Sequence, residues 1–295
     1  MKSAKRIQQG FTLVEIAIVL LIVTILLGYT VAMFPRQQEL KQYRAVKQQM
    51  DEVIEAIIGF AQVNGRLPCP ALPNSTGNED YDAIGDTGCN NYAGFVPVNT
   101  LGLDGRFNED SLLIDPWGNP YRYYVTDADF NRLPAGSGAG NGLSDFTAPG
   151  EMRAVGLVDT DNAGAGDGYI DLDGRYLICD SAGSSTDDRC SGANTVFGKF
   201  TDNGPPFDRY GGAPLVLLSM GKNWSEAPAG DELENSGNIT ITGPSGTDYL
   251  LKDVASGETT FVRRPGGLAD DFDDVVRWVS PSLLFSRMIQ ADQLP

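Results

Sequence analysis

Histidine is absent from this chain of 295 residues, and cysteine occurs only four times. Without histidine, no Ser-His or Cys-His nucleophile pair can form, and no histidine can act as a general base. A zinc site is also disfavoured, because histidine is missing and no two cysteines have the Cys-x-x-Cys spacing. The sequence therefore predicts a protein that is not an enzyme and that requires no cofactor.

Basic residues are also scarce. The chain has 22 Lys and Arg against 39 Asp and Glu, which gives a formal net charge of -17 at pH 7. Basic side chains cluster only near the N-terminus and in residues 36–47. Because nucleic-acid binding requires a basic face, we expect no nucleic-acid partner.

The one long apolar run lies close to the N-terminus. Residues 11–34 contain a single charged side chain, Glu15, and the run exceeds the roughly 20 residues that a membrane-spanning helix needs. Lys2, Lys5 and Arg6 precede it, and basic residues beside a spanning helix stay in the cytoplasm. The pattern predicts a single-pass segment with the rest of the chain outside the cytoplasm.

Residues 1–10 have the composition of a leader and end in Gly10. An ordinary secretory signal places its cleavage site after the apolar stretch, whereas this small residue stands before it. Cleavage after Gly10 would leave the apolar helix on the mature chain and create a new α-amine on Phe11. That amine would lie four residues from Glu15, whose charge is costly in lipid, by about 2.5 to 3.5 kcal/mol near the centre of a spanning helix.

The basic leader, Gly10, Phe11 and Glu15 together resemble the processing signature of type IV prepilins and of the pseudopilins of type II secretion. The resemblance implies that prepilin peptidase cuts between Gly10 and Phe11, that Phe11 is N-methylated, and that the chain assembles with other pilins or pseudopilins through its N-terminal helix. In the assembly, Glu15 would pair with the Phe11 amine of a neighbouring subunit, so that neither charge is buried alone.

The resemblance also implies a location. The chain would reside in the bacterial inner membrane with its C-terminal domain in the periplasm, and then enter a pilus or pseudopilus. The size of the region beyond the helix favours a minor subunit, because a large domain crowds a tightly packed filament. The alternative is a membrane-anchored periplasmic binding domain that never assembles, although such an anchor has no use for Glu15.

The chain divides into four segments. Residues 1–10 form the leader, 11–34 the transmembrane or filament-core helix, 35–64 its amphipathic continuation, and 65–295 an extracytoplasmic β-rich domain. In the continuation, apolar residues recur at spacings of three and four, as on one face of a helix; they are Leu40, Tyr43, Val46, Met50, Val53, Ile54, Ile57, Ile58 and Ala61. Glycine and two prolines in residues 64–70 end the helix.

The β-rich region consists of short apolar runs broken by Gly, Asn, Asp and Pro, a pattern typical of strands and long loops. The predicted strands are 94–98, 121–126, 152–158, 175–179, 215–220, 238–242, 259–263 and 274–279. After the last strand, Ser280 is expected to cap a short C-terminal helix with Pro281 at its first position. We therefore predict an α+β, pilin-like fold in which a long N-terminal helix packs on an antiparallel β-sheet domain with long loops.

The string DPWGNPYRYYV, residues 115–125, resembles a segment of the major pseudopilin of type II secretion and its relatives. Physically, it is a turn rich in Pro, Gly and Asn that leads into an aromatic strand, so we interpret it as a structural hairpin rather than a binding element.

The four cysteines suit an oxidising compartment, where an even number usually indicates disulfides. Three pairings are possible. We favour Cys69 with Cys89 and Cys179 with Cys190, because each of these pairs closes a short loop rich in Gly, Asn and Ser.

Residues 159–174 form the densest acidic stretch. The spacing approximates the Asp-x-Asp-x-Asp-Gly pattern of a calcium loop, provided that residues 163–166 are an insertion. The candidate ligands are Asp159, Asp161, Asp167, Asp171 and Asp173, with the last in place of the usual bidentate Glu. A structural Ca²⁺ site and a solvated acidic loop both fit this pattern.

Overall fold

The computed structural model describes residues 12–129, 142–155, 174–181, 195–197, 199–200, 209–210, 212–224, 230–256, 259–264 and 272–294. For 29–36, 195, 199–200, 209–210 and 256 it describes the backbone only. The chain forms two compact units, Met1–Ala45 and Val46–Pro295. Each unit is considered by itself below.

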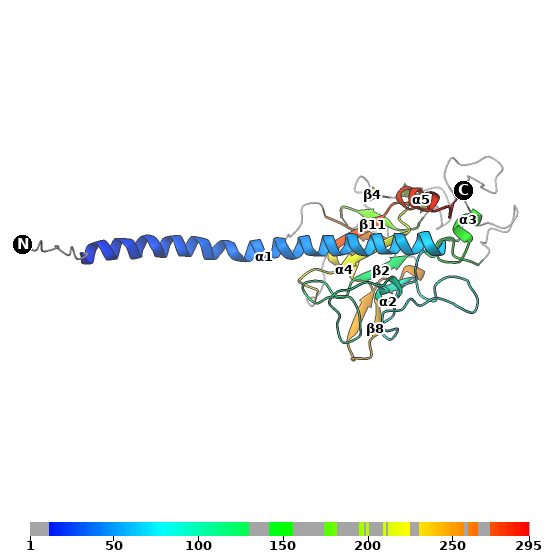
Figure 1. Cartoon of the computed structure of the whole chain (residues 1–295), viewed down its shortest axis with the longest axis horizontal. Coiled ribbons are helices and arrows are strands. Elements are labelled where there is room, and N and C mark those ends of the chain that lie inside the picture. Colours follow the sequence, from blue (N-terminus) through cyan, green and yellow to red (C-terminus); the bar gives the residue numbers. More distant parts are fainter. Residues whose placement is uncertain are drawn as a thin grey trace, which may run out of the picture. The chain divides into compact units, whose positions relative to one another are not determined.

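One long helix, α1 (Leu13–Asn64), forms most of the first unit and continues into the second (Figure 1). It ends where Gly65 adopts a positive φ of 69°, a conformation that glycine tolerates at a helix C-terminus. Pro68 and Pro70 follow within five residues. The predicted helix end near Asn64 is confirmed.

In the described part of the chain, no helix combines the length and the apolar character needed to cross a membrane. Phe11 and the side chains of 29–36 lie outside the description, so the apolar run 11–34 is described only in part.

A four-stranded antiparallel sheet forms the centre of the second unit. Its strands are β1 (Ala93–Phe95), β2 (Arg122–Val125), β7 (Leu215–Ser219) and β11 (Val275–Val279), in the order β1-β2-β7-β11. Every neighbouring pair is antiparallel. β2, β7 and β11 lie within the predicted strands 121–126, 215–220 and 274–279, and β1 overlaps the predicted strand 94–98.

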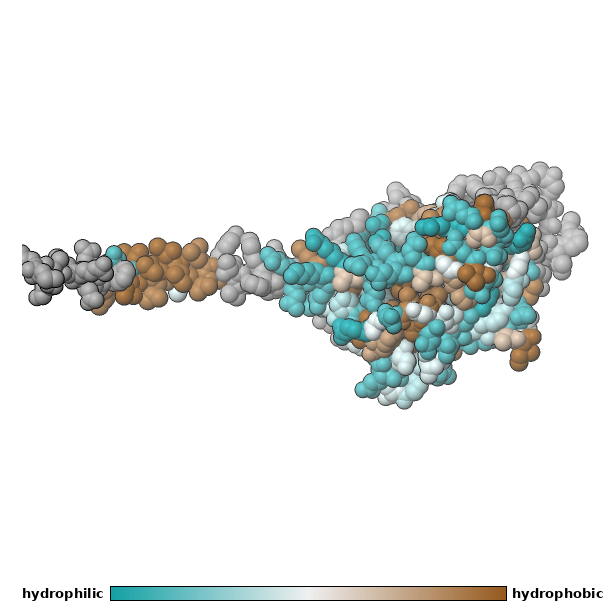
Figure 2. All heavy atoms as spheres, in the orientation of Figure 1, coloured by the Kyte–Doolittle hydropathy of each residue, from teal (hydrophilic) through white to brown (hydrophobic). Residues whose placement is uncertain are grey.

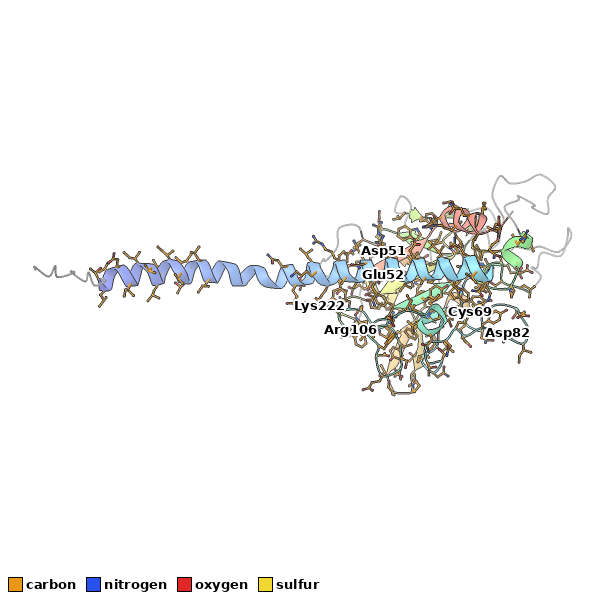
Figure 3. The ribbon with its side chains drawn as sticks, in the orientation of Figure 1. Asp51, Glu52, Cys69, Asp82, Arg106 and Lys222 are labelled. Carbon is orange, nitrogen blue, oxygen red and sulfur yellow. A yellow bond between two sulfur atoms is a disulfide. The ribbon has the colours of Figure 1, made fainter. Side chains whose placement is uncertain are left out.

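The C-terminal part of α1 covers one face of this sheet. The Tyr121 hydroxyl, just before β2, donates to Gln49 Oε1 of the helix at 2.9 Å. Arg277 of β11 donates to Asp51 Oδ2 at 3.1 Å. Figure 3 shows Asp51 on this part of the helix. The helix residues at the interface are spaced by three and four and are fully or almost fully buried; they are Val46, Met50, Val53, Ile57, Ile58 and Ala61.

The opposite face of the sheet carries the second part of the core. Because side chains alternate along a strand, Arg122 and Tyr124 point away from the face that Tyr123 occupies. The apolar members of this core are Phe95, Leu112, Tyr124, Tyr176, Ile178, Ala213, Val216, Leu218, Met220, Tyr249, Leu251, Val254, Phe261 and Val276.

Smaller sheets are also present among the described residues. β10 (Thr260–Val262), β3 (Leu177–Cys179) and β4 (Thr195–Phe197) form one, β8 (Ile239–Thr242) and β9 (Asp248–Leu251) a hairpin, and β5 (Lys199–Phe200) and β6 (Arg209–Tyr210) another pair. The β10–β3 pair is parallel, so the expectation of antiparallel pairing was wrong for these two strands. Parallel pairing is possible here because a long stretch of chain separates them.

The described residues of the second unit also form five short helical segments: α2 (Val98–Leu101), α3 (Glu151–Val155), α4 (Asp231–Ser236), the 3₁₀ helix η2 (Val254–Ser256) and α5 (Pro281–Gln290). The predicted cap of α5 is confirmed, because Ser280 Oγ accepts from the Leu283 amide at 3.3 Å. The strand predicted for 152–158 was wrong over its described residues. The sequence Glu-Met-Arg-Ala-Val of α3 consists mostly of good helix formers.

The 115–125 string forms a turn that carries the chain into β2. Asp115 Oδ1 accepts from the amides of Trp117 and Asn119, both at 2.9 Å, and Oδ2 accepts from the Ser219 hydroxyl at 2.7 Å. Burial raises the pKa of Asp115. These contacts fix the turn against β7 and agree with a structural interpretation.

Candidate functional site

Glu15 lies in the first turn of α1 and takes part in its capping. Its Oε2 accepts from the Thr12 amide and the Thr12 hydroxyl, and Thr12 Oγ1 accepts from the Glu15 amide, all at 3.3 Å. This reciprocal pattern is a capping box, in which a Thr and a Glu three residues later satisfy two amides that the helix leaves unpaired. The Thr-x-x-Glu spacing in the sequence could have indicated this role, which the sequence analysis missed.

The apolar side chains that follow Glu15 are exposed all around the helix. Their exposed fractions run from 41% for Val23 to 64% for Ile25. The hydropathy colouring in Figure 2 shows this segment as an apolar stretch. A helix that is apolar all round requires surroundings that exclude water, in a protein core, an assembly or a membrane. Within the first unit, the described residues do not supply such surroundings.

Gly10 and Phe11, the two residues of the predicted cleavage site, lie outside the described residues. The described part of the predicted assembly site is therefore Glu15 with its cap partner Thr12, and it stands at the start of the exposed apolar stretch.

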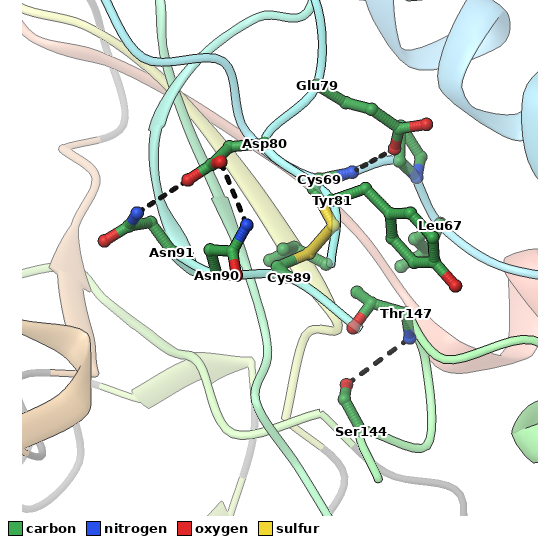
Figure 4. Close-up of a disulfide and its surroundings, with 12 residues drawn as sticks. Leu67, Cys69, Glu79, Asp80, Tyr81, Cys89, Asn90, Asn91, Ser144 and Thr147 are labelled. Carbon is green, nitrogen blue, oxygen red and sulfur yellow. Dashed lines mark hydrogen bonds between the residues drawn. A yellow bond between two sulfur atoms is a disulfide. The ribbon is translucent and has the colours of Figure 1, made fainter. Parts of the chain in front are cut away.

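A disulfide joins Cys69 and Cys89, with their Cα atoms 5.3 Å apart (Figure 4). This is one of the two local pairs that the sequence analysis favoured. Cys179 is fully buried at the end of β3. Cys190 lies outside the described residues, so the second pair stays a prediction.

An ion pair reinforces the loop that this disulfide closes. Arg66 donates to both carboxylate oxygens of Glu79, at 2.7 and 2.8 Å, and Glu79 Oε2 also accepts from the Cys69 amide at 2.9 Å. The Arg66 guanidinium stacks 4.0 Å from the centre of the Tyr81 ring. The segment that leaves α1 is thus held by a covalent bond and by a partly buried bidentate ion pair.

The candidate calcium ligands Asp159, Asp161, Asp167, Asp171 and Asp173 all lie outside the described residues, so calcium binding stays a prediction. Among the residues that are described, no group of three or more His, Cys, Asp or Glu side chains is placed to hold a metal ion.

Comparison with known proteins gives one finding. Residues 5–31 match the family described as the prokaryotic N-terminal methylation motif. No curated protein and no solved structure matches the chain. The matched range includes the predicted cleavage site, Thr12, Glu15 and most of the exposed apolar stretch. The chain therefore carries the prepilin-type signature at its N-terminus.

Proposed function

We propose that this chain is a structural subunit of a type IV pilus or of a type II secretion-like filament, and that it is a minor pilin or pseudopilin. The observation that carries the proposal is the methylation motif at 5–31. It coincides with the exposed apolar part of α1, whose first turn is capped by Thr12 and Glu15. In this function the chain acts through assembly and not through catalysis. Its large second unit favours a minor subunit.

In the proposed pathway, the chain first resides in the bacterial inner membrane with its C-terminal domain in the periplasm. Prepilin peptidase then cuts between Gly10 and Phe11 and methylates the Phe11 amine. The exposed apolar side chains of α1 pack against the helices of other pilins or pseudopilins, which removes them from lipid or water. Glu15 pairs with the Phe11 amine of a neighbour.

The capping box gives Glu15 a second possible role within its own helix, and two substitutions separate the roles. Glu15→Gln removes the charge but keeps an acceptor for the Thr12 amide, since Gln serves at this position of a capping box. Glu15→Ala removes both. If the charge pairs with a neighbouring amine, both variants assemble poorly, because leaving one member of a buried ion pair alone costs about 3 to 5 kcal/mol.

The measurement is the amount of each variant that co-fractionates with sheared filaments or other pilin-like subunits, relative to its amount in the inner membrane. Glu52→Gln is the matched control, because Glu52 lies on the same helix, is exposed, and accepts a local bond from Gln48. Normal assembly of Glu15→Gln together with poor assembly of Glu15→Ala would show that capping, and not charge, is what matters. Normal assembly of both variants would contradict a role of Glu15 in assembly, and absence of the unaltered chain from the filament fraction would favour the alternative of an anchored periplasmic domain.

Mass analysis of the N-terminal peptide of the same material tests processing. The expected peptide begins with methylated Phe11. A chain that retains Met1 would contradict the proposal.

A further inference from the structure

A cavity of about 350 Å³ lies in the second unit, on the face of the central sheet opposite α1. The sheet contributes Phe95 of β1 and Arg122 of β2, which are paired across the two strands. Met220, which follows β7, adds a second apolar wall residue beside Phe95. Residues of α4 and β9 also line the cavity, and the volume lies within the range of small-molecule sites.

Arg122 is the unusual residue of this cavity. Its side chain is only 8% exposed, and burial lowers its pKa. Nη1 donates to the Ser236 carbonyl at 3.1 Å, and Tyr124 provides a further side-chain hydrogen bond. A guanidinium has five N–H donors, so these two neutral acceptors among the described residues do not use them all. A planar, buried guanidinium of this kind is well suited to bind a carboxylate.

Three carboxylates line the cavity with Arg122, those of Glu232, Asp248 and Asp274, and each accepts a hydrogen bond from another donor. Glu232 Oε1 accepts from the Asn223 side chain at 2.8 Å and from the Asp273 amide at 3.3 Å. Asp274 Oδ2 accepts from the Asn235 side chain at 2.9 Å, whereas its buried Oδ1 has no hydrogen-bond partner among the described residues, and its charge acts on Arg122. Burial also raises the pKa of Asp274 to about 7, so near neutral pH this group is partly protonated and balances the Arg122 charge only in part.

The rest of the cavity suits an apolar body. Phe95 and Tyr249 are buried in its wall, their rings 5.2 Å apart in an edge-to-face arrangement. Trp224 and Leu250 are 44% and 39% exposed, which places them where the cavity meets solvent. Removing an apolar group from water against these side chains adds affinity that does not depend on charge.

We infer that this cavity binds a small molecule that has an apolar body and one carboxylate, with the carboxylate anchored by Arg122. The inference goes beyond the proposed filament function and does not depend on it. The wall residues set the shape of the apolar body, and Arg122 distinguishes an acid from a neutral compound of the same shape.

The test compares 3-phenylpropanoate with 3-phenylpropanamide, which share an apolar body and differ in charge. Each is titrated into the full chain in a non-ionic detergent while tryptophan fluorescence is recorded, since Trp224 lines the cavity. We expect saturable binding of the acid, and roughly tenfold weaker binding of the amide, because a charge-assisted hydrogen bond is stronger than a neutral one. Trp224→Phe should remove most of the signal.

Two variants locate the effect. Arg122→Gln should lower the affinity for the acid to that for the amide, whereas Arg106→Gln, at an exposed arginine, should leave the difference unchanged. If Arg122→Gln fails to fold, as judged by circular dichroism, the acid and amide titrations of the unaltered chain still test whether the cavity prefers a carboxylate. Equal binding of acid and amide, tighter binding of the amide, or no saturable binding of the acid would overturn the inference.

Discussion

The two parts of α1 have the same backbone and opposite surroundings. In residues 13–27, every large apolar side chain is at least 41% exposed. In residues 46–61, the apolar side chains at helical spacing are buried against the sheet. The first part is apolar on all sides, and the second has one apolar stripe with charged residues such as Asp51 and Glu52 on its exposed face.

The two parts of α1 show that the number of apolar faces of a helix determines how many packing partners it requires. A helix with one apolar stripe can bury that stripe against one sheet face of the same chain, so the second part of α1 can be stable in an isolated molecule. A helix that is apolar all round needs partners on every side, which a single sheet cannot supply. The apolar content of the first part therefore supports interaction with other molecules rather than folding of this one.

The largest expected contrast comes from one isoleucine in each part. Ile57 is fully buried, and Ile18 is 53% exposed. Ile57→Ala should lower the free energy of unfolding of the second unit by about 2 to 5 kcal/mol, because it removes buried methyl groups and leaves a cavity. Ile18→Ala should change that free energy by less than about 0.5 kcal/mol. Urea unfolding of both variants, followed by tryptophan fluorescence, measures the difference. Equal losses would contradict the division of the helix.

A second contrast concerns acidic groups and pH. Burial raises the pKa of Asp274 to about 7, from 3.8 in the absence of the fold. The folded state therefore holds this proton more tightly than the unfolded state. Its contribution to stability is complete below about pH 4 and is lost as the pH rises to about 7, by up to about 1.4 kcal/mol per pH unit.

Asp274→Asn should remove this part of the pH dependence, and Glu15→Gln in the exposed part of α1 should not. The free energy of unfolding of the unaltered chain and both variants, measured from pH 4 to pH 8, gives the slopes to compare. If Asp274→Asn has the slope of the unaltered chain, Asp274 is not the buried acid that the structure indicates.

The smallest contrast is between two helix caps. Ser280 caps α5, and Thr12 caps α1, each through a 3.3 Å bond from an amide. Ser280→Ala should destabilise the second unit by about 1 kcal/mol, a typical value for the loss of an N-cap. Thr12→Ala should leave that stability unchanged and increase hydrogen exchange only in the first turn of α1. Amide exchange at Leu283 and Glu15 measures both effects, and a global destabilisation by Thr12→Ala would contradict the prediction.

Features that depend on local spacing were predictable from the sequence. In residues 40–61 the apolar side chains recur at spacings of three and four, which predicts the C-terminal part of α1. Ser280 directly precedes Pro281, which predicts the cap of α5. The apolar runs of β7 and β11 are long enough to identify strands. The segment 152–155 was too short for any period to separate helix from strand.

Other features depend on contacts that no local pattern records. The parallel pairing of β10 with β3 joins segments far apart in the chain. The cavity likewise combines Phe95, Arg122, Trp224 and Tyr249 from four separate segments. In strand β8, with the sequence Ile-Thr-Ile-Thr, Ile241 is partly buried against the core but Ile239 is 36% exposed, so simple alternation does not give the burial of each isoleucine.

The way in which residues 46–61 pack on the sheet also determines how the second unit bears mechanical load. Their buried side chains lie one after another along the helix axis, so a pull along that axis loads them in shear, all at the same time. Just beyond the helix, the Cys69–Cys89 disulfide and the pairing of Arg66 with Glu79 fasten the next segment to the same unit. Tension transmitted through α1 is therefore shared among many contacts, and the disulfide limits how far the chain can extend if they yield.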